Sequence, residues 1–417
     1  MTFRTFLLSA CLLLLGSATV SAESLNIGLN YPETGRYKNQ GLQQRLAAYL
    51  AVEEINQAGG VLGQPLELVI RNTRGEPEKG AHNTAEMIDQ EGVQMVFGGV
   101  SSAVAIASGK AARDRNRIYF GTLTYSNATT GSEGHPFMFR EPYNAWMTAK
   151  ALGDYLNQNH PNDDYFYITS DYTWGWSVEE SVRQFSNTQD TERHPGVKTP
   201  FPRALITDFR KALEQAAESD AKVLMMVLFG DDMVRALQVA YEMGLTKRMQ
   251  VVVPNLTLGM VRQVGPTIME GVVGGAPWVW NLPYENNYQR GKDFVEAFSD
   301  RYEMRPSSSA ASAYSIVYQY KEAVERAGST NTDAVIRALE GHRYSFLKDE
   351  QYWREFDHQN VQTVYVVRIK PRETVVADQF SSDYFEIIDF LPGDEAAQTR
   401  EEWEQRRKEA GKPARLL

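Results

Sequence analysis

The chain has 417 residues, 42% of them hydrophobic, which is enough for two domains of ordinary size with buried cores. Its formal net charge of −10 argues against binding to nucleic acid or to an anionic membrane surface. The only cysteine, Cys11, lies in the N-terminal segment, so disulfides, thiolate metal sites and a cysteine nucleophile are excluded from the rest of the chain.

The first 22 residues have the pattern of a secretory signal peptide. Arg4 precedes an unbroken apolar run at residues 6–15, and the small residues that follow end in a cleavage-site pattern at residues 20–22. Cleavage near Ala22 is therefore expected. No later stretch reaches the roughly 18 apolar residues of a membrane-spanning helix, so we expect a soluble, exported protein.

The body of the chain alternates strand-like and helix-like segments. Apolar strands are predicted at residues 25–30, 65–70, 94–97 and 118–120, with helices at 42–55, 81–90 and 102–113 between them. The pattern restarts with strands at 165–169, 223–228 and 250–253 and helices at 177–185 and 232–243. Such βαβ alternation predicts two α/β units, each with a parallel sheet and helices on both faces.

The last third of the chain changes pattern. Three helices are predicted at residues 288–302, 309–327 and 332–340, followed by a late strand at 363–370. This late strand suggests that the chain crosses between the two units more than once. Residues 392–417 are rich in charge, which predicts a solvated helix or a disordered tail.

Enzymatic motifs are absent. The sequence has no phosphate-binding loop of the G-x-x-x-x-G-K-[ST] type, and residues 99–103 lack the second glycine of a nucleophile elbow. The six histidines are scattered, with no pair four residues apart as a helical metal site needs. We therefore expect no catalytic residues, no bound metal and no cofactor.

The segment "VFGGVSSA" at residues 96–103 predicts an anion site at a helix start. Gly98 and Gly99 let a ligand approach the backbone, and Ser101 or Ser102 can cap the helix that follows. The free N–H groups there favour a negative charge, and with no Lys or Arg in the loop a single carboxylate suits the site better than a phosphate. A capped helix with nothing bound is the competing interpretation.

Other strand ends are expected to meet at the same edge of the sheets, because ligands of open α/β sheets bind outside the carboxyl ends of the strands. In the first unit, Thr122 and Thr124 follow one strand and Tyr37 lies in the loop after the first strand. In the second unit, a Trp174-Gly175-Trp176 loop follows a strand, and the candidate side chains are Trp174, Phe229 and Asn255. Trp174 forms either a ligand wall or packing between the units.

Several blocks of the sequence resemble the periplasmic solute-binding proteins of the leucine/isoleucine/valine-binding type, the type I class that serves ABC importers. The likeness covers roughly residues 25–370. It rests on residues 27–80, 97–107, 136–152, 167–181 and 355–370, and above all on the turn "NQAGGVLGQP" at 56–65. The resemblance implies two doubly wound α/β lobes joined by a hinge of three crossing segments.

The resemblance also implies roles for the candidate residues. A ligand carboxylate would be held by Ser101 or Ser102 and by Thr124, with help from the backbone of Thr122. The aromatic walls would be Trp174 and Phe229, with Tyr37 reaching into the cleft.

The chain departs from the pattern of the amino-acid-binding members at one position. Those members usually place an acid opposite the ligand ammonium, where this chain has Asn255, and a neutral amide does not compensate a desolvated ammonium. Asp231 and Asp232 are alternatives, although both resemble helix-start caps. The ligand is therefore predicted to be a branched-chain or other amino acid, an aromatic or aliphatic acid, or an amide.

The organisation expected from this resemblance is a monomer that closes on a small molecule. Lobe 1 would comprise residues 24–143 plus 279–348 and lobe 2 residues 144–278 plus 349–392, with a charged tail at 393–417. The expected partners are the permease and ATPase subunits of an importer in the inner membrane, and the expected location is the periplasm. The alternative is a ligand-sensing subunit that docks a membrane receptor or kinase. A hydrolase using Ser101 is disfavoured, because no histidine with a partner acid is placed to activate the serine.

Overall fold

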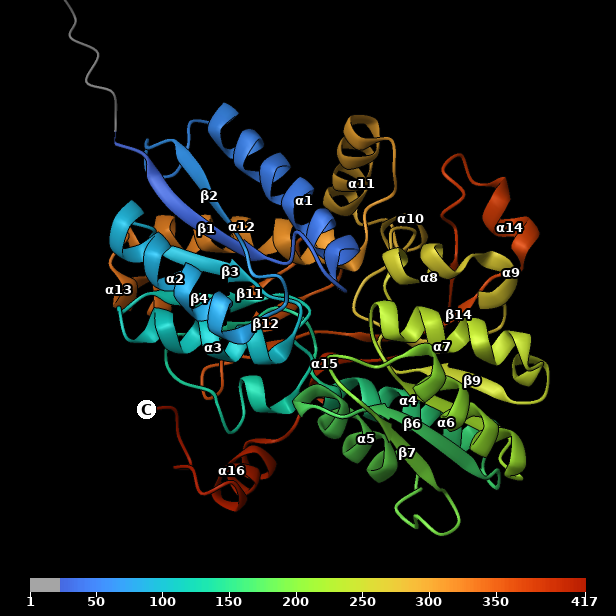
Figure 1. Cartoon of the computed structure of the whole chain (residues 1–417). Helices are drawn as coiled ribbons and strands as arrows, with labels where there is room; N and C mark the ends of the chain where they lie inside the picture. Colours follow the sequence, from blue (N-terminus) through green and yellow to red (C-terminus); the bar gives the residue numbers. More distant parts are fainter. Residues whose placement is uncertain (1–22) are drawn as a thin grey trace, which may run out of the picture.

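The first α/β unit is built on a five-stranded sheet in a computed structural model that describes residues 23–417 (Figure 1). The predicted signal peptide lies outside the described residues. The strand order is β2-β1-β3-β4-β5, and every neighbouring pair is parallel. Its strands are β1 (Leu25–Tyr31), β2 (Leu66–Asn72), β3 (Met95–Gly98), β4 (Ile118–Gly121) and β5 (Met138–Arg140). The connecting helices are α1 (Lys38–Gln57), α2 (Pro77–Glu91) and α3 (Ser102–Arg113), and a short 3-10 turn, η1, covers Asn127–Thr129.

Three strands of this sheet end at the same level. Asn30 of β1 pairs with Gly98 of β3, which in turn pairs with Gly121 of β4. Gly98 has a φ of +128°, and a Cβ there would lie 2.3 Å from the Asn30 carbonyl oxygen. Only glycine therefore lets β3 turn sharply into α3, and this turn brings the loops after β1, β3 and β4 to one edge.

The second α/β unit is built on a seven-stranded sheet in the order β15-β14-β10-β9-β8-β6-β7. Its strands are β6 (Tyr165–Ser170), β7 (Gly196–Thr199), β8 (Val223–Val227), β9 (Gln250–Val253), β10 (Val273–Ala276), β14 (Val364–Ile369) and β15 (Phe385–Leu391). The late strand β14 is present as predicted, but it runs antiparallel to β10, and the unpredicted β15 pairs antiparallel with it. The helices of this region are α4 (Ala145–Asn159), α5 (Thr173–Phe185), α6 (Ile206–Glu218), α7 (Asp231–Glu242), α8 (Leu258–Val264), α9 (Pro266–Met269) and α14 (Arg372–Ala377), with the 3-10 turn η2 at Leu245–Lys247.

The chain passes between the two sheets three times (Figure 1). It leaves the first sheet after β5, returns after β10, and leaves again before β14. The returning stretch carries α10 (Leu282–Glu285), α11 (Gln289–Tyr302), α12 (Ser308–Ala327) and α13 (Thr332–Leu339), and α12 packs along α1. A small sheet of β11 (Arg343–Tyr344), β12 (Gln351–Trp353) and β13 (Asn360–Val361) lies in the last crossing.

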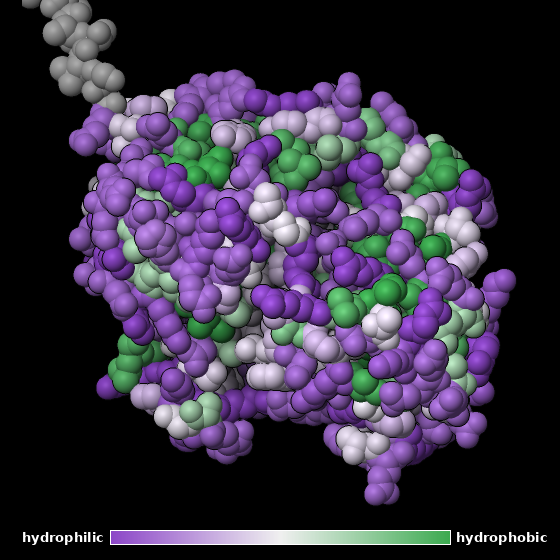
Figure 2. Space-filling view, viewed as in Figure 1, coloured by the Kyte–Doolittle hydropathy of each residue, from purple (hydrophilic) through white to green (hydrophobic). Residues whose placement is uncertain are grey.

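The surface is mainly polar. On the face shown in Figure 2, hydrophobic residues gather in several separate groups rather than in one patch. No helix within residues 23–417 is long and apolar enough to cross a membrane.

Burial of His135 makes the stability of the first unit depend on pH. The side chain is buried, and burial together with the charge of Arg113 lowers its pKa to about 3 from 6.5. Below about pH 6.5 the unfolded chain therefore protonates this histidine, whereas the native protein does not. The free energy of unfolding that is present above about pH 6.5 is lost as the pH falls toward 3.

We expect the urea midpoint of the natural protein to fall between about pH 7 and pH 4 more steeply than that of a His135→Gln variant. The measurement is urea unfolding followed by circular dichroism at several pH values in that range. Equal slopes for the two proteins would contradict the prediction.

Candidate functional site

The hydroxyls predicted at the edge of the first sheet fall into two groups. Ser102 Oγ accepts a hydrogen bond from the Ser126 backbone N–H at 3.1 Å. Thr122 Oγ1 donates to the Gly99 carbonyl at 3.1 Å and accepts from Gln44 Nε2 at 2.7 Å. Both side chains are therefore used to hold loops together.

Ser101 and Thr124 remain as hydroxyls for a ligand. Ser101 is the N-cap residue of α3, and its side chain makes no capping hydrogen bond. Thr124 Oγ1 is buried and has no hydrogen-bond partner among residues 23–417. The start of α3 thus carries the Ser101 hydroxyl beside its free N–H groups, and the Ser126 N–H ties the loop of Thr124 to Ser102 in the same helix start.

Arg140, at the end of β5, fixes the loop that carries Thr124. It is fully buried and donates to the carbonyls of Thr124 (3.1 Å from Nη1) and Ser126, to Thr130 Oγ1 at 2.5 Å and to Gln359 Oε1 at 2.7 Å. Burial lowers its pKa to about 9, so the guanidinium remains charged at neutral pH. No pattern around Arg140 in the sequence indicates this role.

The aromatic side chains of the second unit lie together. Trp174 is buried and its ring centroid is 5.8 Å from that of Phe229. Trp174 was expected in a loop, but α5 begins at Thr173 and places Trp174 in its first turn. The helix points Trp176 outward, where 49% of it is exposed, so only one of the two tryptophans contacts the aromatic cluster.

The two units touch through aromatic rings. The Tyr37 ring of the first unit lies 5.9 Å from Phe229, and its hydroxyl is 3.4 Å from the hydroxyl of Tyr172. Tyr125 adds a further contact of 6.2 Å to Phe229. We call these residues the inter-unit aromatic cluster: Tyr37, Tyr125, Tyr172, Trp174 and Phe229. Burial raises the pKa of Tyr37, Tyr125 and Tyr172, so all three keep their protons.

An ion pair between the two units lies next to this cluster. Arg36 Nη1, from the loop before α1, lies 2.7 Å from Asp232 Oδ2 at the start of α7. Asp232 does not cap the helix as expected, because Gly230 is the N-cap residue. Burial raises the pKa of Asp232 to about 6, although Arg36 opposes the shift. A carboxyl that is both buried and already paired is a poor counter-ion for a ligand ammonium.

Asn255 is buried beside the cluster. Its Nδ2 donates to the Tyr143 hydroxyl at 3.2 Å, and the Tyr143 ring is 5.2 Å from that of Tyr125. Asn255 Oδ1, by contrast, has no partner in the part of the chain that the structure describes.

Buried polar atoms without partners gather around this interface. Within residues 23–417 they include Gln40 Oε1, Gln44 Oε1, Thr124 Oγ1, Tyr125 OH, Trp174 Nε1 and Asn255 Oδ1. Most buried polar atoms in proteins are hydrogen-bonded, so we expect these six atoms to have hydrogen-bonding partners outside the described chain. Sequence reasoning missed Gln44, Tyr125 and Tyr172, although the last two directly neighbour the predicted Thr124 and the aromatic loop.

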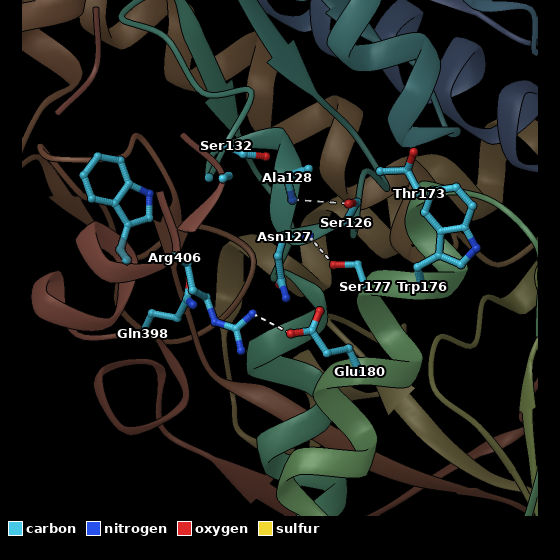
Figure 3. Close-up of a pocket in the computed structure, with 13 residues that line it drawn as sticks. Ser126, Asn127, Ala128, Ser132, Thr173, Trp176, Ser177, Glu180, Gln398 and Arg406 are labelled. Carbon is cyan, nitrogen blue, oxygen red and sulfur yellow. Dashed lines mark hydrogen bonds and ion pairs between the residues drawn. The ribbon is translucent and has the colours of Figure 1, made fainter. Parts of the chain in front are cut away.

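A separate cavity of about 280 Å³ lies beside η1 and α5 and is shown in Figure 3. It is lined partly by the C-terminal segment, and none of the eight residues predicted for the ligand site lines it. The described residues hold no cluster of three or more His, Cys, Asp or Glu side chains arranged for a metal ion. In the same range no histidine hydrogen bonds to Ser101 or Ser102, so the serine hydrolase alternative gains no support.

Comparison with known proteins identifies the fold. Residues 24–374 match the family described as periplasmic binding protein. A Leu/Ile/Val-binding protein homologue of Brucella melitensis is 24% identical over 402 residues, covering 93% of this chain and 94% of the relative.

Solved structures of periplasmic binding proteins have the same fold. A periplasmic binding protein of Burkholderia mallei matches with a TM-score of 0.81 and 25% identity, over 91% of this chain and 97% of the other. An amino acid ABC transporter substrate-binding protein of Pseudomonas fluorescens matches with a TM-score of 0.78 and 22% identity, over 89% and 96%. The predicted fold class, two α/β lobes of the type I periplasmic binding protein fold, is confirmed.

Proposed function

The chain belongs to the periplasmic binding protein family, and from this premise we propose that it is the substrate-binding protein of an ABC transporter whose ligand is a small carboxylate without an ammonium group. The observation that carries the ligand class is the electrostatics of the inter-unit site. Thr124 offers a hydroxyl without a partner among residues 23–417, in the loop that the Ser126 N–H ties to Ser102 at the start of α3, whereas Asn255 and the paired Asp232 offer no free negative charge.

The carboxylate end of the ligand would lie against the first unit. Ser101, Thr124 and the N–H groups at the start of α3 are hydrogen-bond donors, and the helix dipole favours a negative charge at this point. The backbone of Thr122 is held at the same edge by the bond of its side chain to Gly99. Charge-assisted hydrogen bonds of this kind are the strong ones in binding sites.

The rest of the ligand would lie against rings and amides. Tyr37, Trp174 and Phe229 supply aromatic faces, and Asn255 Oδ1 accepts a hydrogen bond from a hydroxyl or amide of the ligand. An ammonium placed there would lose its hydration and meet neutral side chains and a carboxylate, Asp232, that is already paired with Arg36, which costs several kcal/mol. The site therefore favours an aliphatic or aromatic acid over an amino acid.

Binding would proceed by hinge closure. Four residues of the aromatic cluster are buried in the contact between the units and Tyr172 is partly buried, which supports a closed arrangement. Ligand would enter when the lobes separate. We propose the lobes as residues 24–143 plus 279–348 and residues 144–278 plus 349–392. The permease and ATPase subunits of the transporter are the proposed partners of a monomeric binding protein in the periplasm, after cleavage near Ala22. The relatives are named as binding proteins, and no observation favours the sensing alternative.

The proposal is tested by matched pairs of ligands that differ only in the ammonium group. We expect 4-methylpentanoate to stabilise the protein against heat more than L-leucine does, and 3-phenylpropanoate more than L-phenylalanine. At 100 times the dissociation constant the gain is about 2.7 kcal/mol. A result in which only the amino acids stabilise would overturn the ligand class, and a broad panel of acids without any effect would overturn the function.

Two variants complete this test. Thr124→Val removes the unpartnered hydroxyl, and we expect roughly ten-fold weaker binding of the best acid, because a charged group loses one hydrogen bond. Thr84→Val removes an equally buried hydroxyl from α2, and it should lower stability without changing affinity.

A further inference from the structure

The C-terminal segment is folded and partly buried. It carries α15 (Gly393–Ala396) and α16 (Arg400–Glu409), and it lies beyond residues 24–374, which match the family. The sequence predicts a solvated or disordered tail, but Trp403 and Arg407 of α16 are only 2% and 3% exposed. The charged pattern did not predict these contacts, because most of the other side chains of the helix face solvent.

The helix α16 is anchored on the first unit. Trp403 Nε1 donates to the Thr130 carbonyl at 2.9 Å, and the Trp403 ring lies 5.3 Å from that of Phe356. Arg407 donates to the carbonyls of Gly131 and Gly134, the latter at 3.3 Å. Because the segment leaves the second sheet at the end of β15, this anchor makes the tail a fourth connection between the units (Figure 1).

Arg406 is the side chain of α16 that hydrogen bonds to α5 of the second unit. Arg406 Nη1 lies 3.0 Å from Glu180 Oε1 of α5, and its Nη2 donates to Gln184 Oε1 at 3.0 Å. The guanidinium carbon is 4.7 Å from the centre of the Trp146 ring of α4. Figure 3 shows Arg406 spanning to Glu180 across the 280 Å³ cavity. Trp403 lines the same cavity but hydrogen bonds to the first unit, so the hydrogen bonds from α16 to α5 come from Arg406.

We propose that α16 is a strap across the hinge, in which Arg406 stabilises the closed arrangement of the two lobes. The inference rests on the proposed hinge closure. When the lobes separate, α5 moves relative to the loop at residues 130–134 that holds Trp403. The ion pair and the cation–π contact of Arg406 then have to break. Both contacts are partly solvated, so their combined effect is a bias in the equilibrium rather than a lock.

Charge reversal tests the strap. Spin labels attached through Glu78→Cys and Glu214→Cys, two exposed positions, report the distance between the lobes. No other cysteine competes for the label in the mature protein, because Cys11 is the only cysteine and belongs to the predicted signal peptide. We expect Arg406→Glu and Glu180→Arg each to raise the open-to-closed ratio of the ligand-free protein about three- to ten-fold. The double variant should restore much of the closed population. Lys408→Glu, an exposed position on the same helix, should leave the ratio unchanged.

The outcomes separate the two proposals. The strap is overturned if Arg406→Glu behaves like Lys408→Glu, or if the double variant is as open as the single ones. If the natural protein shows one unchanged distance with and without 4-methylpentanoate and the other acids of the panel, hinge closure fails and the strap with it. If that distance shortens with an acid but Arg406→Glu has no effect, the proposed function stands and only the strap fails. Tryptophan fluorescence and circular dichroism verify that each variant is folded.

Discussion

Replacing Gly230 by alanine is expected to weaken ligand binding by roughly 10- to 100-fold while both α/β units stay folded. Gly230 has a φ of +62°, and a Cβ there would lie 2.8 Å from the Tyr37 ring and 3.0 Å from the Arg36 carbonyl oxygen. Both neighbours belong to the first unit, so the added methyl group opposes the closed arrangement directly. The measurement is titration of the best acid from the thermal screen, followed by calorimetry.

The chain offers a matched control at Gly244. Its φ is +73° in the left-handed helical region, where alanine carries a modest backbone cost, and nothing lies within 4 Å of the added Cβ. Gly244→Ala should therefore lose some stability through backbone strain alone and bind the acid normally. Equal affinities for the two variants would show that Gly230 is not part of the closing contact.

Replacing Arg140 by methionine is expected to destabilise the protein by about 3–5 kcal/mol and to abolish measurable ligand binding. The change removes four donors at once and leaves the buried carbonyls of Thr124 and Ser126 without their partner. Because these carbonyls belong to the loop that carries Thr124, the loop would move away from the start of α3. Urea unfolding measures the stability, and calorimetry measures the binding.

Arg113→Met is the control for the loss of an arginine in the same unit. Arg113 is paired with its neighbour Asp114 at the surface, at 2.9 Å, and we expect a change below about 0.5 kcal/mol. If Arg140→Met were equally mild, Arg140 would not be the residue that positions the ligand loop.

Local patterns in the sequence were sufficient for the elements around the site. The helix predicted at residues 102–113 has those bounds in the structure, and the predicted strands before it differ by at most two residues at either end. These elements combine a strong apolar period with a glycine turn, so neighbouring residues alone specify them. Strand β15 was missed because it is partly exposed and pairs only with β14 at the edge of the sheet.

The site was less completely predictable. The eight candidate residues are all buried at the level of the strand ends or at the aromatic cluster. The sequence did not indicate which of them hold loops together and which remain for a ligand. Ser102 and Thr122 hold loops, whereas Thr124 is left without a partner among the described residues. Arg36, Arg140 and Tyr172 were missed, because their importance comes from partners that are more than ten residues away in the sequence.

Residue type and local spacing were enough to predict the alternation of strands and helices, the glycine turn before α3 and the absence of an acid at Asn255. The tertiary structure alone decided that Asp232 pairs with Arg36, that Arg140 holds the loop of Thr124 and that the charged tail returns to bridge the two units. The physical reason is distance along the chain. Hydrogen bonds and ion pairs between remote segments depend on how the sheets are placed, and no local period encodes that placement.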